Sequence, residues 1–250
     1  MYGEGVYAEV FGDTPTAYLP PAQLSLATSL RAVAASRGVP LIGIYVGGRD
    51  RLLAPFDTLF DAHLISFYPG PYGGVAMVTT LLGAHNPCAR LPMTLHAADA
   101  QQLPYWRARA DYTTVPASIE DMDPRKQDLP LYPFGHGLSF TQFKLSEFAV
   151  TVGKADGTVE HAAGRIPTQF GPQDTVSASV VITNVGARQG AWPVLLRVRD
   201  DACIVPPAPA MVKAFERVEL DAGSSHVCKF EVCRSPSSCI ASAVRACHAM

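Results

Sequence analysis

The sequence has 250 residues, of which 48% are apolar and 17% charged, and its formal net charge is −2. This length allows two ordinary domains with real cores, and the near-neutral charge argues against nucleic-acid binding, which needs a basic surface. No run of 18 apolar residues occurs, so no membrane span is predicted, and the N-terminus lacks the basic and apolar regions of a signal peptide.

The first part of the chain has the pattern of an α/β domain. Prolines suit the first turn of the first helix, and Gly38 follows its end, where a left-handed C-cap is expected. The apolar runs that follow predict strands buried on both faces. One face of the first helix holds, at helical spacing, Leu24, Ala27, Leu30 and Ala34. The expected elements are a helix over 20–37, strands over 40–46 and 62–68, and a helix over 72–82.

Between residues 86 and 133 proline recurs and no periodic pattern is found. A segment of this kind in a compact protein usually wraps a surface or serves a site, so we expect a long connector here. The acidic run from Glu120 to Asp123 is interpreted as a solvated loop.

From residue 134 the pattern becomes all-β. Val176, Ala178, Val180 and Ile182 alternate with more polar residues, as in a strand with one buried face. Short strands separated by turn residues predict an immunoglobulin-like or fibronectin-like sandwich. The predicted strands cover 145–152, 175–184, 192–198, 214–220 and 226–232.

The residues after 232 do not continue the strand pattern. Four cysteines gather near this end, and they allow a disulfide framework, a metal site with His226 and His248, or simply a divergent tail. These cysteines are Cys228, Cys233, Cys239 and Cys247.

Four blocks occur in an order that resembles the C-terminal part of family 3 glycoside hydrolases, of the β-glucosidase and exo-glucanase type. They are GEGVYAEVFGD with LPPAQ (3–23), PGPYGGVAMVTTLLGAHNPCARLPMT (69–94), LYPFGHGLSFTQF (131–143), and VITNVGARQG with VKAFERVELDAGSS (181–225). The sequence departs from the family at GGRD (47–50), where Ser-Gly-Arg-Pro is usual, and at Ala89, where glycine is usual.

The resemblance implies a three-layer α/β sandwich, N-terminally truncated, followed by an all-β fibronectin type III-like sandwich. The expected divisions are a partial α/β domain (1–110), a connector (111–135), the fibronectin-like domain (136–232) and a cysteine-rich tail (233–250). The family's barrel domain, which carries the catalytic nucleophile, is expected to precede Met1.

The resemblance also implies retaining hydrolysis of O-glycosyl bonds, with release of terminal β-D-glucosyl or related residues. The family pattern Tyr-x-Glu followed by Gly-Asp matches Tyr7 to Glu9 and Gly12-Asp13, which makes Glu9 the expected acid/base. Glu4, in the same segment, is the alternative. Tyr7, Asp13 and Arg49 are expected at the rim of the substrate site, and the run Arg49 to Arg51 is interpreted as a local ion pair.

The implied partners are a β-glucoside or oligosaccharide substrate and the missing barrel, with no nucleic acid. Neither a metal nor an organic cofactor is implied. The compartment stays open, because family members are often secreted or periplasmic. The alternative function is a non-catalytic remnant or a structural, carbohydrate-associated module, because one carboxylate without its nucleophile cannot perform a double displacement.

Overall fold

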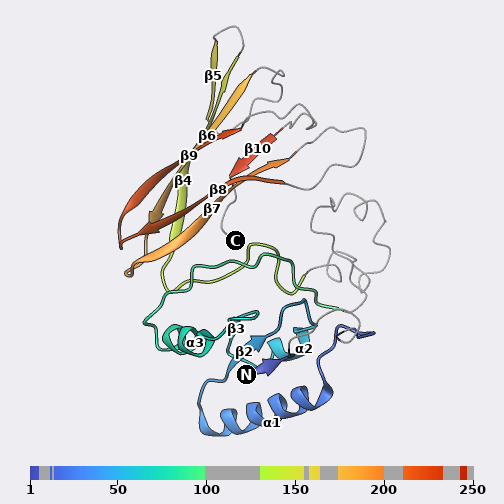
Figure 1. Ribbon diagram of the computed structural model, residues 1–250. Helices are drawn as coiled ribbons and strands as arrows, with labels where there is room; N and C mark the ends of the chain where they lie inside the picture. The colour runs from blue at the N-terminus through green and yellow to red at the C-terminus, as the bar shows by residue number, and fades with distance from the viewer. Residues whose placement is uncertain are drawn as a thin grey trace, which may run out of the picture. The chain divides into compact units, whose positions relative to one another are not determined.

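The computed structural model describes residues 1–5, 12, 14–98, 130–154, 158–163, 174–199, 211–232 and 243–246. These residues form two compact units, each of which is described by itself (Figure 1). The first unit contains the described residues up to 85 together with 91–98 and 130–135. The second contains 86–90 and the described residues from 136 onward. The domain boundaries at 110, 135 and 232 stay predictions.

The first unit is an α/β structure, as predicted. Its parallel sheet has the order β1-β2-β3. The elements are β1 (Tyr2–Gly3), α1 (Pro21–Arg37), β2 (Ile42–Val46), α2 (Ala54–Asp57), β3 (Ala62–Ile65) and α3 (Gly73–Leu81). The sequence had not predicted β1 or α2. None of the described helices is long and apolar enough to cross a membrane.

Helix α1 begins with proline and ends at Gly38 (φ 63°), whose N–H donates to the last carbonyls of the helix, so the predicted C-cap is confirmed. Ala27 and Ala34 are buried, whereas Leu30 is 46% exposed, so only part of the apolar face seen in the sequence is buried. Arg31 lies on the Ala27 face instead, because it follows Ala27 by four residues, and it forms an ion pair with Asp61 (2.8 Å).

The core of the first unit forms where α1 and α2 meet the sheet. Tyr45 of β2 is 2% exposed, and Tyr2 of β1 stacks on Phe56 of α2 with ring centroids 4.7 Å apart. Ile44 and Val46, on the other face of β2, are only half-buried, so burial on both faces was overestimated. The buried cluster contains Leu19, Ala27, Tyr45, Leu53, Phe56, Leu91 and Leu95.

The second unit consists of two antiparallel sheets, with strand orders β5-β4-β6-β9 and β10-β7-β8, which confirms the predicted all-β second half. The short strands β5 and β10 were not predicted. Strand β10 lies in the segment expected to be a tail, and it pairs with β7. The strands are β4 (Phe143–Gly153), β5 (Val159–Ala163), β6 (Thr175–Asn184), β7 (Gly190–Arg199), β8 (Met211–Leu220), β9 (Ser225–Val232) and β10 (Ala243–Ala246).

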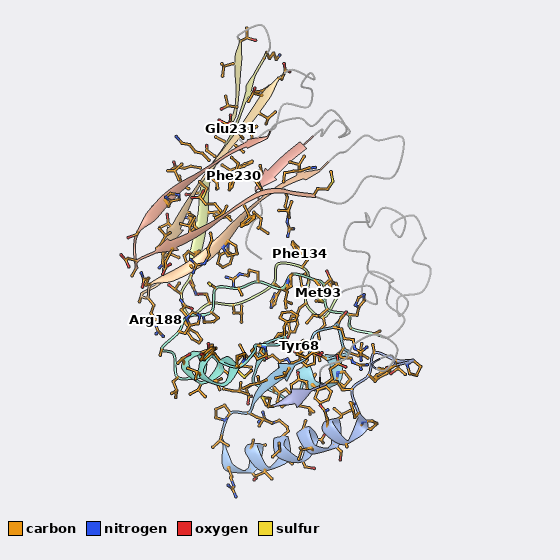
Figure 2. All side chains as sticks on the ribbon, in the orientation of Figure 1. Tyr68, Met93, Phe134, Arg188, Phe230 and Glu231 are labelled. Carbon is orange, nitrogen blue, oxygen red and sulfur yellow. The ribbon has the colours of Figure 1, made fainter. Side chains whose placement is uncertain are left out.

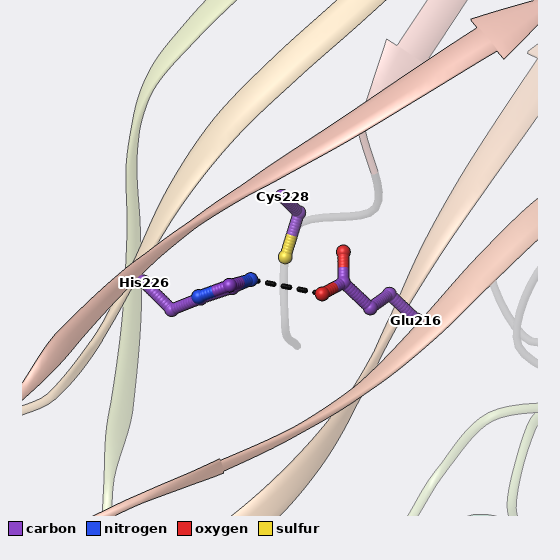
Figure 3. A group of neighbouring side chains, drawn as sticks. All are labelled: Glu216, His226 and Cys228. Carbon is purple, nitrogen blue, oxygen red and sulfur yellow. Dashed lines mark hydrogen bonds and ion pairs between the residues drawn. The ribbon is translucent and has the colours of Figure 1, made fainter.

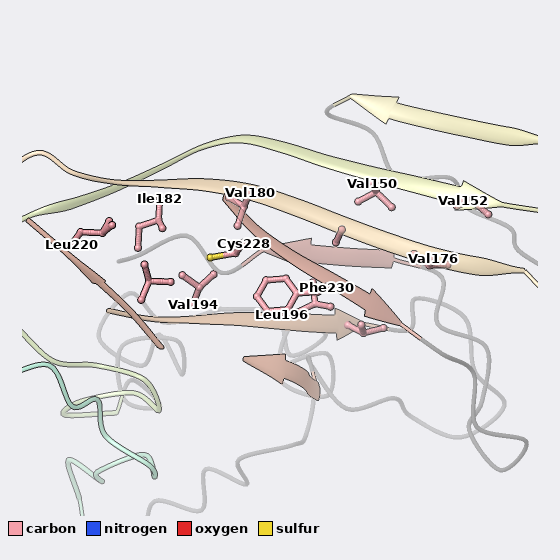
Figure 4. Close-up of a cluster of buried hydrophobic side chains, with 13 residues drawn as sticks. Val150, Val152, Val176, Val180, Ile182, Val194, Leu196, Leu220, Cys228 and Phe230 are labelled. Atoms are coloured by element: carbon pink, nitrogen blue, oxygen red, sulfur yellow. The ribbon is translucent and has the colours of Figure 1, made fainter. Parts of the chain in front are cut away.

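The alternation of side chains along the strands builds the core between the sheets. The four residues predicted to face inward on β6 (176, 178, 180 and 182) are each at most 2% exposed. Phe230 of β9 is buried while its neighbour Glu231 is exposed (Figure 2). Side chains from both sheets meet in one apolar cluster, which includes the buried Cys228 (Figure 4).

Asn184, at the end of β6, is fully buried and makes four side-chain hydrogen bonds. Its Oδ1 accepts from the Thr141 hydroxyl (2.7 Å) and from the Gly186 N–H (3.1 Å). Its Nδ2 donates to the carbonyls of Arg188 (2.7 Å) and Leu220 (3.0 Å). The amide therefore joins the β6–β7 turn to the end of β8 in the opposite sheet.

We predict that Asn184→Asp lowers the free energy of unfolding by about 3 kcal/mol, because a carboxylate cannot donate to the two carbonyls and is costly to bury. Thr183→Ala, at the neighbouring position, removes only an exposed hydroxyl contact with Ser225 and should cost less than about 1 kcal/mol. Urea denaturation of both variants measures the difference. Equal losses would contradict the role of the Asn184 amide.

Candidate functional site

The expected catalytic segment follows β1 at the carboxyl end of the parallel sheet of the first unit. In open α/β sheets this is the edge where ligands bind. Strand β1 ends at Gly3, and the segment with the predicted site residues follows at once. Tyr7, Glu9 and Asp13 lie outside the described residues, so their roles stay predictions. The structure does describe both ends of this segment, at Gly5 and at Gly12.

The start of the segment is fixed by backbone contacts of Gly3. The side-chain amide of Gln23 on α1 accepts from the Gly3 N–H (2.9 Å) and donates to the Gly3 carbonyl (2.7 Å). Gly3 has φ 137°, and a Cβ at this position would overlap the backbone of Val46 on β2. Only glycine fits this close approach of two strands without strain.

Glu4 forms a buried ionic cluster with two arginines. Its carboxylate accepts hydrogen bonds from Arg49 Nε (3.0 Å) and Nη2 (3.0 Å), and from Arg51 Nε (2.8 Å). Arg51 Nη2 lies 2.6 Å from the same carboxylate. The side chains of Glu4 and Arg51 are only 11% and 8% exposed. Charge-assisted bonds of this kind hold a segment firmly, because either partner alone would be a costly buried charge.

The same arginines also hold the far end of the segment. Arg49 Nη2 donates to the Gly12 carbonyl (2.9 Å). Arg51 Nη1 donates to the Thr16 carbonyl (2.8 Å). The start and the end of the predicted catalytic loop are therefore tied to one pair of side chains that follow β2.

A third strand contributes at the same edge. The Tyr68 hydroxyl, from the segment after β3, donates to the Gly5 carbonyl (2.8 Å); Tyr68 is labelled in Figure 2. The preceding residue, Phe67, has φ 49°, which is uncommon for a bulky side chain. Its carbonyl accepts from the Gly47 N–H (3.2 Å), so this unusual backbone is held by the end of β2.

The environment of Glu4 does not suit a proton donor. Burial alone would raise the pKa of this carboxyl, but the hydrogen bonds and charges of Arg49 and Arg51 outweigh it and bring the pKa below its ordinary value. A general acid must be protonated at the working pH. Glu4 is therefore an ionised anchor of the segment.

The run Arg49-Asp50-Arg51 is not the local ion pair that the sequence suggested. The two arginines pair with Glu4, more than 40 residues earlier in the chain, and Asp50 pairs with His96 through its Oδ2. Asp50 Oδ1 is buried, with no hydrogen-bond partner among the residues that the structure describes. Sequence neighbours with opposite charges thus serve separate contacts, because their side chains point in different directions.

The sequence did not indicate three residues that hold the segment after β1: Gln23, Arg51 and Tyr68. Gln23 lies in the LPPAQ stretch, which carried part of the family resemblance. Its position in that block was the one feature of the sequence that could have indicated its role. Nothing in the local pattern around Tyr68 indicates a bond to Gly5, because that contact spans 63 residues.

We predict that Arg51→Met lowers the free energy of unfolding by about 3 kcal/mol, because it leaves the buried Glu4 carboxylate only partly neutralised. Arg31→Met is the matched control, since it removes an ion pair whose side chains are 30% and 48% exposed, and it should cost much less. Denaturant titration provides both values. A loss for Arg51→Met no larger than that of the control would contradict the anchoring role.

The cluster also predicts a pH dependence. The pKa of Glu4 is lower in the folded protein than in the unfolded chain, so its contribution to stability is present above pH 4.5 and is lost as the pH falls through the lower folded value. The stability difference between the wild type and Glu4→Gln should therefore be largest near neutral pH and shrink in acid. Urea unfolding at a series of pH values tests this, and a difference that grows on acidification would refute it.

The chain is similar in sequence to known proteins. The sequence matches the Glycosyl hydrolase family 3 C-terminal domain over residues 2–140. A periplasmic β-glucosidase of Salmonella typhimurium is 28% identical over 218 residues, which cover 86% of this chain and 26% of that protein. A xylan 1,4-β-xylosidase of Xylanibacter ruminicola is 28% identical over 214 residues, or 86% of this chain and 21% of that protein.

The fold is also found among solved structures. A β-glucosidase from Listeria innocua, solved in complex with laminaribiose, superposes with a TM-score of 0.70 at 23% identity, over 89% of this chain and 29% of that one. The chain thus spans about a quarter of the length of the curated relatives it matches. Because the family match covers more than half of its residues, the chain belongs to glycoside hydrolase family 3.

Proposed function

We propose that the chain contributes the acid/base, Glu9, to a retaining β-glucosidase whose nucleophile stands on a domain outside these 250 residues. The observation that carries the proposal is the double anchoring of the segment 6–11. Gly5 and Gly12, on either side of it, are bonded to Tyr68 and Arg49 at the carboxyl edge of the sheet. An anchored loop can hold a proton donor in a fixed position, which general acid catalysis requires.

Glu9 is favoured over Glu4 for a chemical reason. Glu4 is saturated by two guanidinium groups and stays ionised, whereas a proton donor needs a raised pKa. In the proposed reaction the nucleophile attacks the anomeric carbon while Glu9 gives its proton to the departing glycosidic oxygen. Glu9 then takes a proton from the water that cleaves the glycosyl–enzyme bond.

The remaining predicted site residues have supporting roles in this proposal. The contacts of Arg49 with Glu4 and with the Gly12 carbonyl favour a role in positioning the loop. Tyr7 and Asp13 remain proposed for the rim of the sugar site. Both β-glucosidase and β-xylosidase occur among the relatives, so the proposed substrate class is a β-glucoside or a related β-glycoside.

Exposed apolar side chains support the proposal that this chain functions within a larger protein. Leu26, Leu30 and Val33 follow one another at spacings of four and three residues on α1, and they are 60%, 46% and 48% exposed. Such a row on one helix face is more than the scattered apolar exposure of an ordinary surface. By itself, the 250-residue chain is expected to show no turnover of an aryl β-glucoside.

We predict that Glu9 governs the leaving-group dependence of the assembled enzyme. In a chimera, this chain replaces the matching C-terminal quarter of the Salmonella typhimurium relative. Glu9→Gln should lower kcat/KM for an alkyl β-glucoside by about 10²- to 10⁴-fold, because the departing alkoxide needs a proton. With a dinitrophenyl β-glucoside, whose leaving group departs without a proton, the rate of the glycosylation step should fall far less.

Glu4→Gln is the matched control in the same chimera. Its effect should be similar for both substrates, because it disturbs the position of the loop and leaves proton donation intact. Equal losses for both substrates in Glu9→Gln would reject Glu9 as the acid/base. An inactive chimera that still binds glucosides would favour the carbohydrate-associated, non-catalytic module.

A further inference from the structure

One edge of the β-sandwich carries polar side chains on rows that otherwise face the core. Strands β8 and β9 are consecutive in the chain but lie in different sheets. Side chains two residues apart on a strand share a face. Glu216 therefore shares the inward face of β8 with the buried Val218, and His226 and Cys228 share the inward face of β9 with the buried Phe230. The three polar side chains thus point between the sheets.

These three side chains converge (Figure 3). His226 Nε2 lies 2.8 Å from Glu216 Oε1, and the three potential ligand atoms, with Cys228 Sγ, all lie within 4.8 Å of one another. Cys228 is fully buried, whereas the side chains of His226 and Glu216 are 45% and 38% exposed. The group is therefore closed on the core side and open to solvent on the other, which provides an entry path for an ion.

The chemistry of the group suits one kind of ion. An imidazole nitrogen, a thiolate and a carboxylate are the ligands that zinc takes in proteins, at about 2.0–2.3 Å, with its ligand atoms about 3.3–3.6 Å apart in a tetrahedral shell. The ligand atoms of this group, all within 4.8 Å of one another, would have to shift to reach such a shell. A divalent ion would also balance the negative charges of a thiolate and a carboxylate at the margin of an apolar core.

We propose that Glu216, His226 and Cys228 form a binding site for one zinc-like divalent ion, with water as the fourth ligand. Within the described ranges of the chain, no other three His, Cys, Asp or Glu side chains come this close together. The ion would join the two sheets at the edge where β8 passes to β9. It would stabilise the sandwich because it binds only the folded arrangement.

The competing interpretation is a plain hydrogen-bonded pair, Glu216 with His226, beside a core cysteine that acts as a small apolar residue. Without an ion, burial and the nearby Glu216 carboxylate raise the pKa of the Cys228 thiol to about 12. An ion would have to displace the thiol proton to solvent. Direct metal binding separates the two interpretations.

The test is a titration of the full 250-residue chain with Co²⁺, followed by displacement with Zn²⁺. We expect one equivalent of Co²⁺ to produce a thiolate-to-metal charge-transfer band, and Zn²⁺ to abolish the band and raise Tm. Cys228→Ala should remove the band. Glu216→Gln and His226→Gln should each weaken binding beyond the roughly 10- to 100-fold cost of losing an outer-shell partner.

Matched controls exclude adventitious binding. Glu219→Gln, on the outward face of the same strand, His85→Gln and Cys88→Ala should leave the band and the affinity unchanged. The titration is repeated with the four cysteines outside the described residues changed to serine (203, 233, 239 and 247). A band that survives Cys228→Ala, a band that is lost in the four-serine background, or no band in the wild type would each overturn the proposal.

Circular dichroism checks the fold of each variant. If Cys228→Ala does not fold, Glu216→Gln and His226→Gln in the four-serine background still test the site, because both variants keep the Cys228 thiol. Wild-type affinity in those two variants would refute the site.

Discussion

The carboxyl edge of the parallel sheet is organised by one buried carboxylate. The Glu4 carboxylate pairs with two guanidinium groups, and the side chains of Glu4 and Arg51 are nearly closed to solvent. Removing either partner would therefore leave an unpaired charge where water solvates it poorly. The arginines use their remaining donors on the carbonyls of Gly12 and Thr16. A single ionic cluster thereby unites the end of β1, the segment after β2 and the return of the loop. The proposed acid/base depends on this frame for its position.

In the second unit, the neutral side chain of Asn184 has a comparable linking role. Asn184 supplies two donors and an acceptor with two lone pairs, and each is used by a partner in the structure. An amide can link the two sheets at this corner without the solvation cost of a charge. The nearby group of Glu216, His226 and Cys228, which also brings β8 and β9 together, is built from ionisable side chains instead. The end of the sandwich where β8 passes to β9 thus combines a neutral link with a group of ionisable side chains.

Much of this architecture can be predicted from the sequence, for physical reasons. Alternation predicted the buried face of β6 correctly, because a strand repeats every two residues and its burial follows directly. The end of α1 was also predicted, since Gly38 meets a backbone requirement that few residues satisfy. The exposure of Leu30 could not be predicted, because apolar residues surround this helix and their spacing does not decide which row is buried. Strands β5 and β10 are too short to show a period.

The partners of Arg49 and Arg51 were not predicted, because ion pairs across more than 40 residues leave no local pattern. Placing the catalytic segment depended on the family motif, whose central residues lie outside the described part of the chain.

The glycine at position 3 has a consequence for protein engineering. Its missing side chain lets two neighbouring strands meet closely enough for Gln23 to complete the edge hydrogen bonds. The point from which the following loop departs is therefore set by the close approach of two backbones, which the Gln23 amide secures. A fusion junction that falls before Tyr2 leaves this departure point intact, whereas a linker that replaces Gly3 would push the strands apart. A combinatorial library of this region should therefore hold Gly3 constant.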